Sequence, residues 1–213
     1  MKACRPGRIL RGVGAGEWLI VVALLACCVG TTRAYEHRRG IPSVGGQLQR
    51  GYLGFDSDWT NVYEWGKGGT ISVRQYVARN RAIGFSFEQQ KFYRIKDLPQ
   101  EGTWNPDALQ LQMLMLDYYF YFNRLRKWTY YLVLSAGAYR PEEIDNADQG
   151  DGLQVNYPSE NVLARVGWGL ERFLRRTVSI DASLSFYYIN APGIDGVTGS
   201  AQLALGVHVY AGR

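Results

Sequence analysis

The sequence predicts an all-β fold, a closed antiparallel up-and-down barrel of eight strands that crosses a membrane. Three observations lead to this prediction. Polar and apolar residues alternate over eight segments. These segments are longer than soluble strands, which usually have about five or six residues. The connections between the segments are alternately short and long. A chain of 213 residues, 46% hydrophobic and 20% charged, is long enough for one such domain.

Residues 1–34 have the layout of a secretory signal peptide, with basic residues, an apolar run over 18–29 and small residues at 32 and 34. The basic residues are Lys2, Arg5, Arg8 and Arg11. A spanning helix needs roughly 17 to 25 apolar residues, so the run excludes a helical membrane protein. One alternative stays open, because Leu24-Leu25-Ala26-Cys27 resembles a bacterial lipobox in which Cys27 would be lipidated.

Without this leader the chain is nearly neutral. Five of the 24 basic residues but one of the 19 acidic residues lie in residues 1–34, so the net charge falls from +5 to +1. We therefore expect no nucleic-acid partner. All three cysteines, Cys4, Cys27 and Cys28, also lie in the leader, and the mature chain has no disulfide.

We expect residues 35–45 to form an N-terminal periplasmic segment and residues 46–213 to form the barrel domain. In chain order the predicted strands are 46–56, 67–78, 81–91, 109–122, 128–140, 161–172, 176–188 and 198–210. The first is the least regular, because Gln47, Gln49 and Arg50 interrupt its alternation. The seventh is the clearest, with apolar residues at every second position from Val178 to Tyr188.

Ionisable residues decide which face of each strand points inward. The fourth strand is ambiguous in phase, and we place its apolar face outward because this turns Asp117 away from lipid. The same reasoning places five residues in the lumen at similar height: Arg74, Glu88, Asp117, Arg165 and Asp181. Eight strands leave an interior only just wide enough for side chains, so we expect these residues to pair in a structural network. A narrow gated pore or apolar-solute channel is the alternative.

The connections also alternate in length. Residues 79–80, 123–127 and 173–175 are short turns, whereas 57–66, 92–108, 141–160 and 189–197 are longer. Short turns at one end and long loops at the other are typical of bacterial outer-membrane barrels, with both termini in the periplasm and the long loops extracellular. Lipid offers no hydrogen-bond partners, so a spanning sheet must close on itself.

A soluble up-and-down barrel would expose its polar faces and should carry many Lys and Glu on them. Here those faces are mostly Ser, Gly, Gln, Tyr and Ala, which favours the membrane barrel. Aromatic residues near the strand ends are typical of interfacial girdles. The candidates are Tyr118, Phe120, Phe122, Trp128 and Tyr130 towards the short turns, and Phe186 and Tyr188 towards the loops.

On this pattern the sequence resembles the small OmpA-like and OmpX-like outer-membrane barrels over its whole length. The resemblance implies a monomer that contacts lipopolysaccharide and phospholipid and is inserted by the barrel assembly machinery. That machinery recognises an aromatic residue at the C-terminus of such barrels. In this sequence the corresponding residue, Tyr210, lies three residues before the end. We expect no peptidoglycan-binding domain after the last predicted strand.

We expect no catalysis and no cofactor or metal. Residues 186–191 resemble the His-x-Ser-Asn region of lipid A deacylase barrels, but Tyr187 and Ile189 stand where the base and nucleophile would be. His208 lies near the short-turn end and is expected in the lumen or at the rim. The acidic loop 141–160 lacks the spacing of an EF-hand, so we expect a solvated loop.

The short-turn end is strongly basic and has no acidic residue in or beside its turns. Such a ring could contact anionic phospholipid head groups of the periplasmic leaflet. Its members are Arg79, Arg81, Arg124, Arg126, Lys127, Arg172, Arg175 and Arg176.

Overall fold

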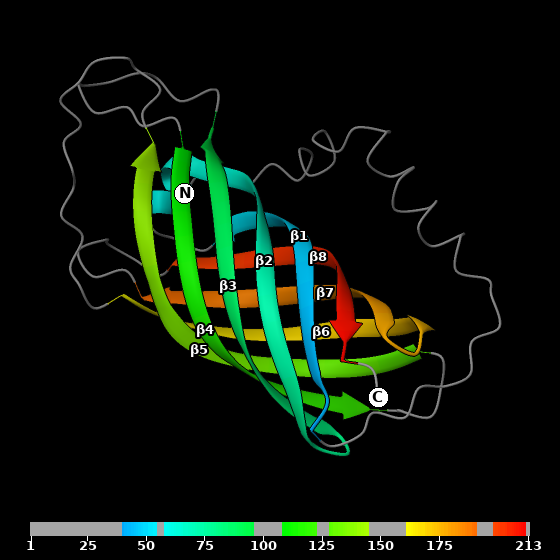
Figure 1. Ribbon diagram of the computed structural model, residues 1–213. Helices are drawn as coiled ribbons and strands as arrows, with labels where there is room; N and C mark the ends of the chain where they lie inside the picture. Colours follow the sequence, from blue (N-terminus) through cyan, green and yellow to red (C-terminus); the bar gives the residue numbers. More distant parts are fainter. Residues whose placement is uncertain are drawn as a thin grey trace. The chain divides into compact units, whose positions relative to one another are not determined.

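A computed structural model describes residues 40–54, 58–95, 108–122, 128–144, 161–190 and 198–211. Eight antiparallel strands form a closed barrel in chain order, with β8 hydrogen-bonded to β1 (Figure 1). This confirms the predicted fold class. The strands are β1 (Pro42–Gly54), β2 (Tyr63–Ala78), β3 (Arg81–Arg94), β4 (Ala108–Phe122), β5 (Trp128–Ile144), β6 (Val162–Arg175), β7 (Val178–Asn190) and β8 (Thr198–Tyr210).

Several strands extend beyond their predicted bounds. β1 begins at Pro42, so residues 42–45 belong to the barrel and not to the expected periplasmic segment. β5 continues to Ile144, into the expected loop 141–160. The predicted turn at 173–175 is wrong, because β6 runs to Arg175 with a register irregularity between Phe173 and Arg175. At these strand ends the backbone N–H and C=O groups still form hydrogen bonds with the neighbouring strand, although the side chains no longer alternate between polar and apolar.

The expected loop 57–66 is also partly ordered. A short helix, α2 (Asp58–Val62), leads directly into β2 at Tyr63, four residues before the predicted start. Trp59 on this helix is buried, and its ring meets Tyr139 edge-on at 6.4 Å between centroids. Within the described segments, no helix is long and apolar enough to cross a bilayer.

The outer surface of the barrel is apolar and the inner surface is polar. Leu48 is 79% exposed, Trp168 63% and Phe85 62%, whereas Glu88 inside is fully buried. In water such a distribution would expose large hydrophobic patches and bury charge at high cost. In lipid it is the favourable arrangement, because every apolar outward face is matched to hydrocarbon.

Side chains fill the lumen in three layers. The half nearest the short turns holds a tyrosine cluster: Tyr76, Tyr119, Tyr121, Tyr131, Phe173 and Tyr210, with Ala82 and Val133. The half nearest the loops holds an apolar cluster: Leu53, Trp59, Tyr63, Phe92, Leu109, Leu111, Met113, Met115, Tyr139, Leu163, Tyr187 and Ile189. Charged side chains lie between the two clusters.

Two glycines make room for large inward side chains. A Cβ on Gly169 would lie 1.9 Å from the Tyr131 ring, and a Cβ on Gly45 would lie 1.9 Å from the His208 ring. Glycine at these positions therefore lets each ring lie flat against the neighbouring backbone. Both rings are thereby directed towards Asp181, which accepts a hydrogen bond from Tyr131 and lies 3.3 Å from His208.

Candidate functional site

Arg165 on β6 is the central cation of the lumen. Its Nη2 lies 2.5 Å from Asp117 Oδ1 on β4, and its Nη1 lies 3.6 Å from Glu88 Oε2 on β3. Arg165 Nε also donates a hydrogen bond to Ser135 Oγ at 2.9 Å. One guanidinium thus joins the consecutive strands β3, β4, β5 and β6, because their inward side chains meet in the interior of so narrow a barrel.

Glu88 has further partners on β2 and β7. The Tyr187 hydroxyl donates to Glu88 Oε2 at 2.9 Å and accepts from Arg165 Nη1 at 3.3 Å. Thr70 Oγ1 donates to the same Glu88 oxygen at 3.3 Å. A buried carboxylate costs free energy unless it is paired and hydrogen-bonded, and Glu88 is both.

Arg74 and Asp181 form a second, looser centre nearer the short turns. Arg74 Nη2 lies 3.7 Å from Asp181 Oδ2, and its guanidinium lies 4.3 Å from the centroid of the Tyr119 ring. Asp181 Oδ2 accepts hydrogen bonds from Tyr131 at 2.8 Å and from Gln47 at 2.6 Å. Arg74 is therefore held by aromatic rings as well as by charge.

The structure thus brings together the five residues expected in the lumen, in two groups: Arg165 with Asp117 and Glu88, and Arg74 with Asp181. The sequence reasoning missed Glu171 as a member. It is fully buried and accepts hydrogen bonds from Ser179 at 2.5 Å and from Tyr210. Its place on the same strand face as Arg165 was the available signal, since residues six apart in a strand share a face.

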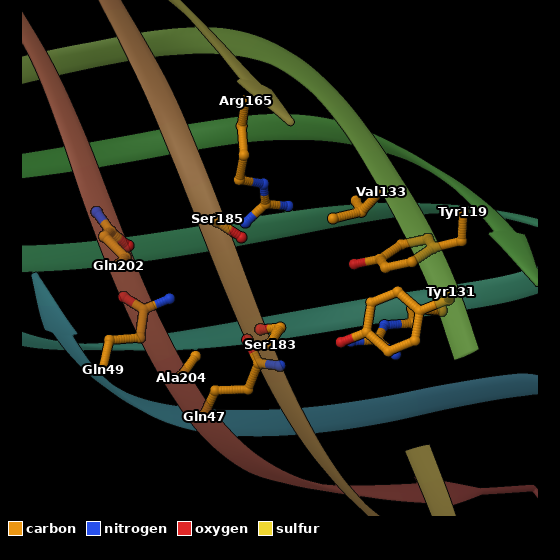
Figure 2. Close-up of a pocket in the computed structure, with 11 residues that line it drawn as sticks. Gln47, Gln49, Tyr119, Tyr131, Val133, Arg165, Ser183, Ser185, Gln202 and Ala204 are labelled. Carbon is orange, nitrogen blue, oxygen red and sulfur yellow. The ribbon is translucent and has the colours of Figure 1, made fainter. Parts of the chain in front are cut away.

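Figure 2 shows a pocket between these groups, lined by side chains from several strands that point into the lumen. Arg165, Tyr119 and Tyr131 border it together with amides and small hydroxyls. The space open to the centre of a water-sized sphere is about 10 Å³, which corresponds to about one water molecule. The side chains around this pocket therefore leave little free volume in it.

The predicted girdle residues face outward. Tyr118, Phe122, Tyr130, Phe186 and Tyr188 are each exposed, while Phe120 and Trp128 are half-buried. The loop end has further outward aromatics that the sequence analysis did not include, namely Tyr52, Trp65 and Tyr93. Outward aromatic side chains therefore lie at both ends of the apolar surface, on β4 and β5 at the short-turn end, as at a membrane interface.

Five members of the basic ring lie in the described part of the chain. Arg79, Arg81, Arg175 and Arg176 are exposed at the short turns. Arg172 is half-buried, with its guanidinium 4.9 Å from the centroid of the Trp128 ring. Arg124, Arg126 and Lys127 lie outside the described residues, as do Cys27, the leader and most of the acidic loop.

The segment compared with deacylase barrels turns two of its side chains inward. Tyr187 belongs to the Arg165 network, and Ile189 packs in the apolar cluster. His208, expected in the lumen or at the rim, is fully buried and lies 3.3 Å from Asp181. Among the described residues, no group of His, Cys, Asp and Glu has the arrangement of a metal site.

Comparison with known proteins identifies the class of fold. No family model and no curated relative matches the chain. Neisserial surface protein A is similar in structure, with 16% identity and a TM-score of 0.55 over 79% of this chain and 96% of that one. Ail of Yersinia pestis, in complex with the heparin analogue sucrose octasulfate, has 16% identity and a TM-score of 0.50 over 82% and 100%. The chain has the fold of the small eight-stranded outer-membrane β-barrels.

Proposed function

We propose that this protein is an integral protein of the bacterial outer membrane, with its termini in the periplasm and its long loops outside. Its barrel is a closed structural body, and its specific activity is binding through the loops. The observation that carries this proposal is the filled lumen, in which the Arg165 network lies between two clusters of packed side chains. The apolar outer face supports the membrane location.

Single-channel recording in planar bilayers tests the closed lumen. Wild-type protein should give no conductance steps, because packed side chains fill both halves of the described lumen and the pocket between the charged groups holds about one water molecule. A porin of known conductance, reconstituted in the same bilayers, serves as the positive control. Stable conductance of the wild-type protein would refute the proposal in favour of a narrow pore.

The membrane location and orientation need a separate test. The protein should fractionate with outer membranes and show heat-modifiable gel migration, since a closed sheet resists detergent until heated. Residues 35–213 contain no cysteine, so single cysteines introduced there can report topology. A membrane-impermeant maleimide should label Asn190→Cys on intact cells and should label Asn80→Cys only after lysis. The reverse pattern would invert the proposed orientation.

An apolar-solute channel is the second candidate, because the loop half of the lumen is lined by aliphatic side chains. Leu109, Leu111 and Met113 there are almost completely buried. These side chains fill the space, and uptake would require them to move. Cells that express the protein should then take up long-chain alkanes faster than cells that lack it, whereas equal rates would exclude this function.

The remaining expectations concern chemistry and partners. We propose no catalysis, and unchanged lipid A in mass spectra of expressing cells would agree with this. We further propose a monomer that is inserted by the barrel assembly machinery. The basic ring at the short turns would contact anionic phospholipid of the periplasmic leaflet, with Arg79 and Arg81 among its exposed members.

A further inference from the structure

Three basic side chains stand next to one another on the outer face of the barrel, near the loop end. Arg50 on β1 is the direct cross-strand partner of Lys67 on β2, and Lys67 is the direct partner of Lys91 on β3. All three lie on the outward face of their strands, in the same alternation as the lipid-facing residues. Like charges that face each other across strands are destabilising.

The ammonium groups of Lys67 and Lys91 lie near the same aromatic ring. Lys67 Nζ lies 5.7 Å and Lys91 Nζ 5.9 Å from the centroid of the same Tyr93 ring. Within the described part of the chain, neither lysine forms an ion pair. The aromatic ring attracts each ammonium group, but it does not neutralise the pair.

The depth of these cations is unusual. Towards the membrane centre, Arg50 stands two residues from Leu48 on its strand. Lys67 stands four residues from Ile71, and Lys91 stands four residues from Phe87. Leu48, Ile71 and Phe87 belong to the apolar surface. On the other side, two residues further towards the loops, follow the aromatics Tyr52, Trp65 and Tyr93, and the first two rings are 5.1 Å apart. The cations therefore lie at the loop-end edge of the apolar surface, beside the aromatic girdle that marks the level of the lipid head groups.

Glutamine side chains lie beside these cations on the outer face of β3 and β4. Gln110 pairs with Lys91 across the strands, and Gln112 pairs with Gln89. Gln110 and Gln112 donate hydrogen bonds to Glu142 on β5 at 3.2 and 3.5 Å, and Arg140 is the cross-strand partner of Gln112. Amides can donate to and accept from sugar hydroxyls, which a simple phospholipid such as phosphatidylethanolamine does not offer.

We propose that this patch, formed by Arg50, Lys67, Lys91, Gln89, Gln110 and Gln112, binds the phosphorylated disaccharide of lipid A in the outer leaflet. The phosphates neutralise Lys67 and Lys91 beside Arg50, and the glutamines contact the sugar. The inference rests on the orientation in the proposed function, because only then does the patch face the leaflet that contains lipid A. It adds to that function a defined lipid and a defined site.

Native mass spectrometry of the folded protein in detergent, titrated with defined lipids, tests the inference. The wild-type protein should prefer lipid A with two phosphates to monophosphoryl lipid A, and both to phosphatidylglycerol. The variant Lys67→Gln with Lys91→Gln should bind lipid A with two phosphates about 25-fold more weakly, since each basic residue near an anionic surface contributes about fivefold. Heat-modifiable migration shows that each variant is folded.

The matched control removes two positive charges that belong to neither the patch nor the basic ring. Arg38→Gln with Arg39→Gln, which precede β1 in the sequence, changes the net charge by the same amount, and lipid A binding should stay within twofold of wild type. Equal losses in both double variants would overturn the inference, because the effect would then come from net charge. Equal affinity for phosphatidylglycerol and lipid A would also overturn it.

Two further results separate the possible ligands and the two proposals. Inorganic phosphate at 10-fold molar excess over lipid A should not displace the lipid, and displacement would mean a site for free phosphate. If cysteine labelling shows the reverse orientation, the proposed function fails, although the protein in detergent could still prefer lipid A to phosphatidylglycerol. If the orientation holds and the wild-type protein shows no selectivity, this inference alone fails.

Discussion

The two halves of the lumen are filled in different ways. The half near the short turns consists of tyrosine rings whose hydroxyl groups meet carboxylates, as in the hydrogen bonds from Tyr131 to Asp181 and from Tyr210 to Glu171. The half near the loops consists mainly of aliphatic side chains such as Leu109, Leu111 and Met113. One half depends on matched hydrogen bonds, and the other depends on close packing.

The difference shows how a barrel this narrow is stabilised. Packing of aliphatic side chains tolerates exchange for others of similar volume, whereas a buried hydroxyl or carboxylate needs its specific partner. The tyrosine half and the charged layer should therefore respond to the loss of single polar atoms, and the apolar half only to loss of volume. Five substitutions test this contrast, from the largest expected effect to the smallest.

Arg165→Ala should cause the largest loss, because it leaves Asp117 and Glu88 inside the barrel without their counter-charge. Breaking a buried ion pair costs about 3 to 5 kcal/mol, less where water reaches the site. Urea titration of the folded protein, followed by tryptophan fluorescence, measures the change. Adding Asp117→Ala should recover part of the loss. A more stable Arg165→Ala variant would contradict the inward placement of this residue.

Arg74→Ala sharpens the same test within the charged layer. Its loss should be smaller than that of Arg165→Ala, because Arg74 lies 3.7 Å from its carboxylate, compared with 2.5 Å for Arg165. Asp181 also keeps the hydrogen bonds from Tyr131 and Gln47. A loss equal to that of Arg165→Ala in the same titration would mean that the cation–π contacts of Arg74 contribute as much as charge pairing.

Leu111→Ala probes the apolar half. It removes a buried side chain from the apolar cluster and should lower the free energy of unfolding by about 3 kcal/mol, within the range for such cavities. Leu111→Met keeps the volume and should cost less than about 1.5 kcal/mol. Equal losses for the two variants in urea titration would mean that this half does not depend on packed volume.

Gly169→Ala perturbs the tyrosine half through shape alone. The added Cβ would lie 1.9 Å from the Tyr131 ring, so the ring must move away from Asp181. Such overpacking costs about 1 to 3 kcal/mol. Gly46→Ala is the matched control, because its Cβ would approach nothing closer than 3.8 Å. If both variants unfold at the same urea concentration, the position of the Tyr131 ring does not depend on the absence of a side chain at Gly169.

Tyr210→Phe should have the smallest effect. It removes one hydroxyl that donates to Glu171, while Ser179 continues to donate to the same carboxylate. The expected loss is about 1 kcal/mol. Tyr118→Phe on the outer face is the control and should change the urea midpoint very little. An equal effect at both positions would contradict the role of buried hydroxyls in the short-turn half.

The alternation in the sequence determined much of this protein. It predicted eight strands, their chain order and the outward face of β4, because side chains in a strand point to opposite faces at period two. It also placed Arg74, Glu88, Asp117, Arg165 and Asp181 inside. These features are local, since each follows from residues within one segment.

Strand bounds and partners depended on the tertiary structure. Alternation did not show that β1 begins at Pro42 or that β6 runs to Arg175, because the ladder continues where the pattern is weak. It also did not show that Arg165 pairs with Asp117 and Glu88, or that Lys67 stands opposite Lys91. Register between strands and the closure of β8 on β1 decide which side chains meet, and neither is encoded in the pattern of a single strand.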